Sequence, residues 1–303
     1  MLSLILTIIL TILPINAFTN ADFLKSEIDR PEEVDFPLSL GPKLTAKSAL
    51  VVDEATNEIF FEKNPTEVLP VASITKLMTA LAFLENKNKG WDEWVEVEEE
   101  DLLLPTSDVG NKEELPPAQL GLRPGEKIKI KDVFYACLIE SANDAAKILA
   151  RLTGPCCAKT FVDLMNERAL SLGMTNTYFS EPTGLSPQNY STAQDLAQLV
   201  RAAFRRDEIK QALGKKYYNI PVLKKDGIKR WHRLKNTNKL LDTFVNLAGA
   251  KTGYLEESGY CFAGLSRQAE RQLVVIILGA ETEKHRFQEA KALIWWSSTR
   301  FAR

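Results

Sequence analysis

The chain has 303 residues, 45% of them hydrophobic, which is enough for the core of one large domain or two small ones. Its 38 basic and 40 acidic residues are mixed along the sequence and leave a formal net charge of −2, which argues against a nucleic-acid partner. The two histidines, His232 and His285, lie far from any Cys, Asp or Glu cluster with metal-ligand spacing, so we expect no metal and no other cofactor.

The first 17 residues are interpreted as a signal peptide. Residues 2–13 form an apolar run, and the sequence Ile15-Asn16-Ala17 after Pro14 supplies a small-residue cleavage site. A run of this length is too short to cross a bilayer comfortably. We therefore expect an extracytoplasmic protein, in the periplasm or the cell-wall space. No Lys or Arg precedes the run, so an uncleaved N-terminal membrane tether stays open.

Residues 18–44 carry mixed charge and several prolines without a hydrophobic period, and are interpreted as a lead-in segment. Two β-prone runs at 49–53 and 58–62 flank a turn and predict a hairpin. A helix that is apolar on most sides follows from Ser73 to about residue 84, which predicts burial at the centre of the fold. Residues 86–126 are polar and rich in proline, and predict a long loop with one strand-like piece at 94–97.

Further helices are predicted at 132–140, at 145–152, at 161–172 and, after a capping box at Ser191 to Gln194, up to residue 204. A second hairpin is predicted at 217–222 and 228–234, followed by strands at 248–254, 260–265 and 273–279 and a closing helix at 283–298. This order predicts an α+β fold. Both ends of the chain contribute to one antiparallel sheet, and a helical insert lies between them.

Three short motifs stand in a definite order. Ser73-Ile74-Thr75-Lys76 opens the buried helix, Ser141-Ala142-Asn143 lies in a break between helices, and Lys251-Thr252-Gly253 lies on a strand. Residues three apart on a helix share a face, so the Lys76 ammonium can reach the Ser73 hydroxyl. Each motif alone is common, and these serines can simply cap helices. Together they form the set known from class A β-lactamases and penicillin-binding proteins.

The sequence resembles the low-molecular-weight D-alanyl-D-alanine carboxypeptidases, which are penicillin-binding serine peptidases. Besides the three motifs, the similar segments are residues 172–177, 182–185, 191–196, 236–238 and 259–261, so the resemblance covers about residues 45–300. It implies a DD-peptidase domain over residues 45–303, with an antiparallel five-stranded sheet flanked by helices and a helical subdomain. It also implies trimming of the terminal D-alanine from peptidoglycan pentapeptides and binding of β-lactam inhibitors. The oligomeric state stays open.

The residues suit an acyl-enzyme mechanism. Ser73 Oγ is the expected nucleophile, and an acyl-enzyme splits the reaction into two easier steps. Lys76 can act as its base if burial and the like charge of Lys251 lower its pKa. Ser141 is expected to shuttle a proton between Lys76 and the leaving amine. Asn143 is expected to hold the substrate amide and Lys76 in place.

The substrate is expected to lie along the strand of the third motif. The resemblance places the oxyanion-hole donors at the backbone N–H groups of Ser73 and Tyr254, and Gly253 is expected to admit the substrate backbone. Lys251 and Thr252 suit the terminal carboxylate of the peptide or of a β-lactam. Arg286, early in the last helix, resembles a family arginine that assists there.

Several alternatives stay open. A β-lactamase of the same fold needs a deacylating base, for which Glu181 is the candidate, although the sequence around Glu181 resembles the carboxypeptidases. A DD-endopeptidase differs only in its substrate, and a non-catalytic peptidoglycan-binding homologue is the third alternative. The sequence does not decide the pairing of the four cysteines, Cys137, Cys156, Cys157 and Cys261.

Overall fold

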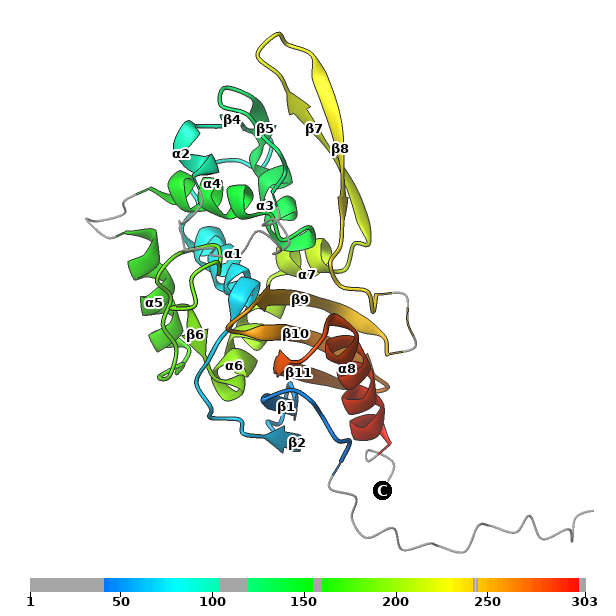
Figure 1. Ribbon diagram of the computed structural model, residues 1–303. Coiled ribbons are helices and arrows are strands. Elements are labelled where there is room, and N and C mark those ends of the chain that lie inside the picture. The colour runs from blue at the N-terminus through cyan, green and yellow to red at the C-terminus, as the bar shows by residue number, and fades with distance from the viewer. Residues whose placement is uncertain (1–40, 104–118, 155–159, 242, 244, 300–303) are drawn as a thin grey trace, which may run out of the picture. The chain divides into compact units, whose positions relative to one another are not determined.

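The computed structural model describes residues 41–103, 119–154, 160–241, 243 and 245–299 (Figure 1). The expected signal peptide, most of the lead-in segment, and Cys156 and Cys157 lie outside these ranges. Within them, no helix has both the length and the apolar character that a bilayer span requires. No group of three or more potential His, Cys, Asp or Glu metal ligands occurs in the described ranges either. Cys137 and Cys261 are free and buried.

The main sheet has five antiparallel strands in the order β2-β1-β11-β10-β9. The predicted N-terminal hairpin is β1 (Ser48–Asp53) and β2 (Ile59–Lys63), and the C-terminal strands are β9 (Leu247–Leu255), β10 (Gly259–Gln268) and β11 (Arg271–Ala280). Strand β1 pairs with β11 from Ser48↔Leu278 to Asp53↔Leu273. The prediction that both chain ends build one antiparallel sheet is therefore confirmed, and β9 lies at one edge.

Helices cover both faces of this sheet. Helix α8 (Glu283–Ser298) packs on one face, and α6 (Ala193–Phe204) packs on the other. Alternate residues of each strand point to opposite faces, so Val275 and Ile277 join the core beneath α8, whereas Val274 and Ile276 join the core beneath α6. Burial on both sides explains why β11 reads as a continuous apolar run and not as an alternating one.

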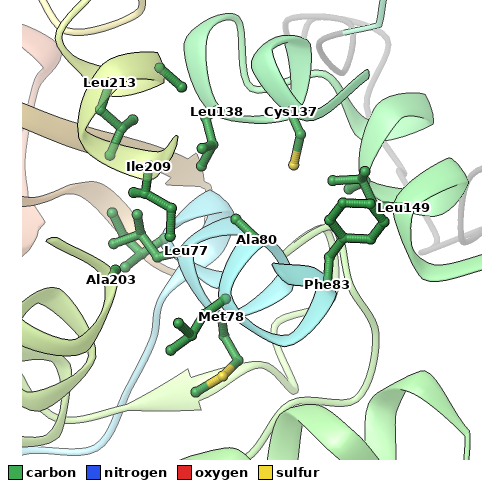
Figure 2. Close-up of a cluster of buried hydrophobic side chains, with 14 of the residues drawn as sticks. Leu77, Met78, Ala80, Phe83, Cys137, Leu138, Leu149, Ala203, Ile209 and Leu213 are labelled. Carbon is green, nitrogen blue, oxygen red and sulfur yellow. The ribbon is translucent and has the colours of Figure 1, made fainter. Parts of the chain in front are cut away.

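Helix α1 (Thr75–Asn86) is the centre of the helical subdomain. Its residues from Thr75 to Leu84 are all buried, and it packs against α3 (Ile130–Ile139), α4 (Asn143–Thr153), α5 (Phe161–Ser171) and α6. Figure 2 shows Phe83 of α1 beside Leu149 of α4, and Leu138 and Cys137 of α3 above α1 in this view. The predicted burial of this helix is therefore confirmed. The physical reason is that a helix with apolar side chains on all sides is stable only when protein surrounds it.

A second antiparallel sheet has the order β4-β5-β7-β8. Strands β7 (Tyr217–Leu223) and β8 (Lys229–Lys235) are the predicted second hairpin, and β4 (Trp94–Glu96) is the predicted strand-like piece. Short elements that the sequence analysis did not predict are β3 (Leu69–Pro70), α2 (Glu99–Leu102), β5 (Lys127–Lys129), β6 (Tyr190–Ser191) and α7 (Asp207–Leu213).

One predicted cap is displaced. The expected capping box began at Ser191, but Thr192 is the N-cap of α6, and its hydroxyl accepts from the N–H of Asp195. The Asp195 carboxylate instead accepts from Asn176 N–H and the Thr177 hydroxyl. The helix therefore starts one residue later than predicted, because the hydroxyl that caps it belongs to Thr192 and not to Ser191.

The loop before β6 closely approaches the turn that precedes α1, and the contact is at Gly184. This glycine has φ +79°, and a Cβ there would lie 2.1 Å from the carbonyl oxygen of Ala72. Gly173, after α5, has a similar φ of +77° but open space around the Cβ position. The two glycines thus share a backbone conformation and differ in the space available.

We predict that Gly184→Ala lowers the free energy of unfolding by about 2–5 kcal/mol, because left-handed strain adds to a clash with backbone. The matched variant Gly173→Ala should lose only about 1–2 kcal/mol, from strain alone. Urea unfolding of both variants measures the difference. Equal losses would mean that the close approach at Ala72 is not a tight packing contact.

Candidate active site

Ser73 lies in a single turn of 3-10 helix, η2 (Ala72–Ile74), that leads into α1. The preceding residue, Ala72, has φ +46°, in the left-handed region. A Cβ on Gly253 of β9 would lie 2.9 Å from the Ser73 nitrogen. The absence of a side chain at Gly253 therefore makes room for η2. The sequence led us to expect room for the substrate backbone at Gly253.

The side chain of Lys76 reaches back from the first turn of α1 and is completely buried. Its Nζ donates to Ser73 Oγ at 3.0 Å, to Asn143 Oδ1 at 2.7 Å and to the carbonyl oxygen of Thr183 at 2.5 Å. An ammonium has three donors, and each has a partner here. The spacing expected from the sequence is confirmed, since Lys76 and Ser73 are in hydrogen-bond contact.

Burial lowers the pKa of Lys76 to about 8, because a dry site disfavours the charged form. Nearby Cys137, Glu181 and Asp144 oppose this shift and raise the pKa of Lys76. The pKa of Lys251 lies well below its usual value, first because of burial and then because of the charge on Lys76. We had expected Lys251 to depress the pKa of Lys76. Burial is the largest cause for both lysines, and the repulsion between the two ammonium groups disfavours a proton on both at once.

Ser141 has φ +66°, a left-handed backbone that non-glycine residues rarely adopt. It follows the end of α3, where the N–H of Ala142 turns back to the carbonyl of Ala136. The Ser141 hydroxyl accepts from Lys251 Nζ at 2.8 Å. Helix α4 begins at Asn143, two residues earlier than predicted. Asn143 is therefore a helical residue, and its side chain is buried against Lys76.

The third motif lies on edge strand β9. Lys251 is completely buried, and its Nζ also donates to the carbonyl of Thr252 at 2.9 Å. The Thr252 hydroxyl donates to the hydroxyl of Thr237 at 2.7 Å. Tyr254 is 43% exposed, and its ring stacks on that of Tyr260 in the adjacent strand, with centroids 4.3 Å apart.

Arg286 reaches the same strand from α8. Its guanidinium is buried and donates to the carbonyl of Gly253 at 3.0 Å and to that of Cys261 at 3.5 Å. Glu283 accepts from it at 3.4 Å. These contacts fix the backbones of β9 and β10, so the structure gives Arg286 a clear role in holding the strand of the third motif.

Two contributors to the site had no role in the sequence analysis. The backbone carbonyl of Thr183 accepts from Lys76. Every residue has a backbone carbonyl, so the identity of the residue does not indicate this role. Thr237 accepts from Thr252, and its own N–H donates to the carbonyl of Ile139 at the end of α3. Both lie in segments that resemble the carboxypeptidase family, and that resemblance was the only sequence signal available for them.

The carboxylate of Glu181 accepts hydrogen bonds from residues of its own loop. One carboxylate oxygen accepts from the N–H and the hydroxyl of Thr183 at 2.6 and 2.5 Å, and the other accepts from Gly184 N–H at 2.6 Å and Asn189 Nδ2 at 2.9 Å. These bonds hold the Thr183 carbonyl against Lys76. Both oxygens of Glu181 are thus occupied by donors of the same loop, which disfavours the β-lactamase alternative.

The site brings a serine, two desolvated lysines and a second serine together between the helical subdomain and the edge of a five-stranded sheet. Neither histidine takes part, since His232 pairs with Glu140 at 2.8 Å and His285 lies on α8 next to Glu281. Such an arrangement can activate a hydroxyl through a neutral lysine, which defines the class of active-site serine enzymes that work without histidine.

Comparison with known proteins agrees with this class. The sequence profile of the D-alanyl-D-alanine carboxypeptidases, peptidase family S11, matches residues 37–282. The chain is similar to the D-alanyl-D-alanine carboxypeptidase DacF of Bacillus subtilis, with 31% identity over 80% of this chain and 59% of that protein. It is also similar to a D-alanyl-D-alanine endopeptidase of Pseudomonas aeruginosa, with 32% identity over 86% of this chain and 80% of that protein.

Among solved structures, a point mutant of a Streptomyces DD-transpeptidase superposes with a TM-score of 0.77 at 26% identity, over 86% of this chain and all of that one. The chain thus belongs to the D-alanyl-D-alanine carboxypeptidase family of serine peptidases. It spans only 59% of the length of the Bacillus subtilis relative.

The depressed pKa of Lys76 predicts a pH-dependent contribution to stability. The folded-state pKa is about 8 and the unfolded value is 10.5, so between these values the unfolded chain binds more protons and stability rises with pH. The free energy of unfolding of the wild type, relative to Lys76→Met, should rise by about 3 kcal/mol from below pH 8 to above pH 10.5. Denaturant unfolding across this range tests the prediction, and a constant difference would contradict it.

Proposed function

We propose that this protein is a serine-type D-Ala-D-Ala carboxypeptidase that removes the terminal D-alanine of peptidoglycan stem peptides and is acylated by penicillin. The observation that carries the proposal is the fully buried Lys76 ammonium, 3.0 Å from Ser73 Oγ. We further propose residues 45–303 as the catalytic domain. It would be delivered outside the cytoplasm by the N-terminal signal.

In this proposal Ser73 is the nucleophile and Lys76 is its base. A neutral Lys76 donates two N–H groups to Asn143 and Thr183, and these two acceptors direct its lone pair at the Ser73 hydroxyl. The Ser73 proton moves to Lys76 as Oγ attacks the carbonyl, and the terminal D-alanine leaves with a proton. Water then hydrolyses the ester. A pKa near 8 leaves a useful fraction of Lys76 neutral near neutral pH.

The substrate backbone would extend along the edge of β9. An edge strand presents unpaired backbone groups to an extended peptide. The N–H groups of Ser73 and Tyr254 would stabilise the oxyanion. The tight packing of η2 on Gly253 supports this proposal, because it brings the Ser73 N–H close to β9, the strand that carries the Tyr254 N–H.

The substrate carboxylate would bind at Lys251 and Thr252. An anion there raises the pKa of Lys251, which is otherwise far below its usual value, so substrate binding favours a proton on Lys251 over one on Lys76. The Ser141 hydroxyl, bonded to Lys251 at 2.8 Å, would donate its proton to the leaving amine and regain one from Lys76, which has taken the proton of Ser73. Substrate binding itself thus helps to prepare the base.

A DD-endopeptidase is the second candidate, since the Pseudomonas aeruginosa relative at 32% identity and an Escherichia coli relative at 31% identity bear that name. The same site would cleave either bond, because the acyl donor is the same and only the leaving amine differs. Release of D-alanine from a pentapeptide and cleavage of a cross-linked dimeric muropeptide, measured side by side, separate the two activities.

We predict that a labelled penicillin forms a stable covalent adduct with the wild type and none with Ser73→Ala. Lys76→Arg should slow formation of the adduct by about 10²–10⁴-fold, because arginine cannot lose its proton. Intact-protein mass spectrometry follows the adduct. Normal acylation of Lys76→Arg would overturn the role of Lys76, and rapid penicillin turnover without an adduct would favour a β-lactamase. Absence of both adduct and turnover in the wild type would leave a non-catalytic homologue.

Thr237 is proposed as a positioning residue. When a carboxylate accepts from the Thr252 hydroxyl, Thr237 can donate to the Thr252 oxygen and keep that hydroxyl oriented. We predict that Thr237→Val raises KM for the peptide about 5- to 10-fold with a smaller change in kcat, as expected for loss of one hydrogen bond. Thr237→Ser should restore KM. Steady-state kinetics of the three proteins test this prediction. If Thr237→Ser does not restore KM, the Thr237 hydroxyl does not position Thr252 and the side chain contributes only packing.

A further inference from the structure

The β7–β8 hairpin concentrates positive charge. Between residues 215 and 235 the chain has eight lysines and arginines and a single acid, Asp226, whereas the whole chain has a net charge of −2. In Figure 1 this yellow hairpin extends well past β4 and β5, the other strands of its sheet. The charge therefore sits on a projecting arm, and these side chains have no part in the proposed hydrolysis.

The two faces of the hairpin have different surroundings. Cross-strand partners in an antiparallel pair share a face. Ile220, Val222 and Leu234 are buried on the inner face, against the helical subdomain. The outer face is made of the pairs Tyr217↔Lys235, Asn219↔Arg233, Pro221↔Trp231 and Leu223↔Lys229. This set of eight residues contains three bases and no acid, and we call it the basic face.

Large apolar side chains are exposed beside these charges. Trp231, in the middle of the basic face, is 70% exposed, and Ile228, at the tip of the hairpin, is 59% exposed. Lys229, Arg233 and Lys235 are exposed around Trp231. The Arg233 guanidinium lies 4.1 Å from the centroid of the Tyr217 ring. Protein surfaces that bind at the headgroup layer of a membrane typically combine exposed Trp and aliphatic side chains with Lys and Arg.

We propose that the basic face docks on an anionic lipid surface. Lys229, Arg233 and Lys235 would meet the headgroup phosphates, while Trp231 and Ile228 would enter the interfacial layer. A soluble polyanion would bind the three basic side chains but leave Trp231 and Ile228 exposed to water. A lipid surface would contact both the basic and the apolar side chains, so we favour lipid as the partner. The peptidase would thereby be held beside the membrane by its own catalytic domain.

Vesicle co-sedimentation of the full chain tests the proposal. The wild type should bind phosphatidylglycerol vesicles in a salt-sensitive manner and bind phosphatidylcholine vesicles much less. The triple variant Lys229→Gln/Arg233→Gln/Lys235→Gln should lose on the order of 100-fold in partition coefficient, since each base near an anionic surface contributes about fivefold. The apolar run at residues 2–13 is present in every protein compared, so its contribution cancels.

Matched controls locate the contact. Lys43, Lys89 and Lys284 are exposed elsewhere on the chain, and their replacement by glutamine removes the same charge without touching the hairpin. Trp295 on α8 is 60% exposed. Trp231→Phe should abolish a blue shift of tryptophan fluorescence on vesicle binding, whereas Trp295→Phe should keep it. D-alanine release from a soluble peptide should be unchanged in all of these variants, which separates this test from that of the proposed function.

Three results would overturn the proposal. The hairpin triple variant and the control triple variant could bind phosphatidylglycerol vesicles equally well. The blue shift could persist in Trp231→Phe. Finally, polyphosphate could bind as tightly as the vesicles without any signal from Trp231, in which case the basic face takes an anionic polymer.

Discussion

The ammonium of Lys76 is the group on which the rest of the site depends. A charge completely removed from water is costly unless every donor has an acceptor. The three acceptors come from three elements: Ser73 from η2, Asn143 from the first turn of α4 and the Thr183 carbonyl from the loop held by Glu181. Displacing any one of these elements leaves a buried donor unsatisfied, so the lysine ties the helical subdomain and the loop into one arrangement.

Two residues beside this group hold an unfavourable backbone. Ala72 and Ser141 both have positive φ without being glycine, at a cost of about 1–2 kcal/mol each. Ala72 directly precedes Ser73, and Ser141 faces Lys251. The packed surroundings maintain both conformations, in the way that strain is commonly stored at functional sites. The backbone on either side of the Lys76 ammonium is therefore maintained at a cost in stability.

Much of this arrangement could be predicted from the sequence. The five strands of the main sheet, the buried helix after Ser73 and the contact between Lys76 and Ser73 all follow from hydrophobic period and residue spacing. The one-turn helix α2 was missed because the acidic run at Glu98 to Asp101 reads as a solvated face. In the structure Asp101 is buried and bonded to Arg151 at 2.9 Å, and such a long-range pair has no local signal.

Other features were inaccessible for related reasons. The carbonyl of Thr183 is a backbone group, and the hydroxyl contact of Thr237 joins segments that are distant in the chain. The start of α4 at Asn143 could not be placed because its N-cap, Ala142, makes no side-chain cap, and because the left-handed residue Ser141 is a serine where glycine is the usual signal. In each case the missing information was tertiary.

The pairing of β1 with β11 sets the order of events during synthesis. Strand β1 has its long-range partner only after residues 271–280 have been synthesised, and closing so large a loop slows folding. Until then β1 has only β2 as a neighbour, and its other edge is unpaired. Completion of the main sheet is therefore a late step, and until it occurs the unpaired edge of β1 is open to pairing with other chains.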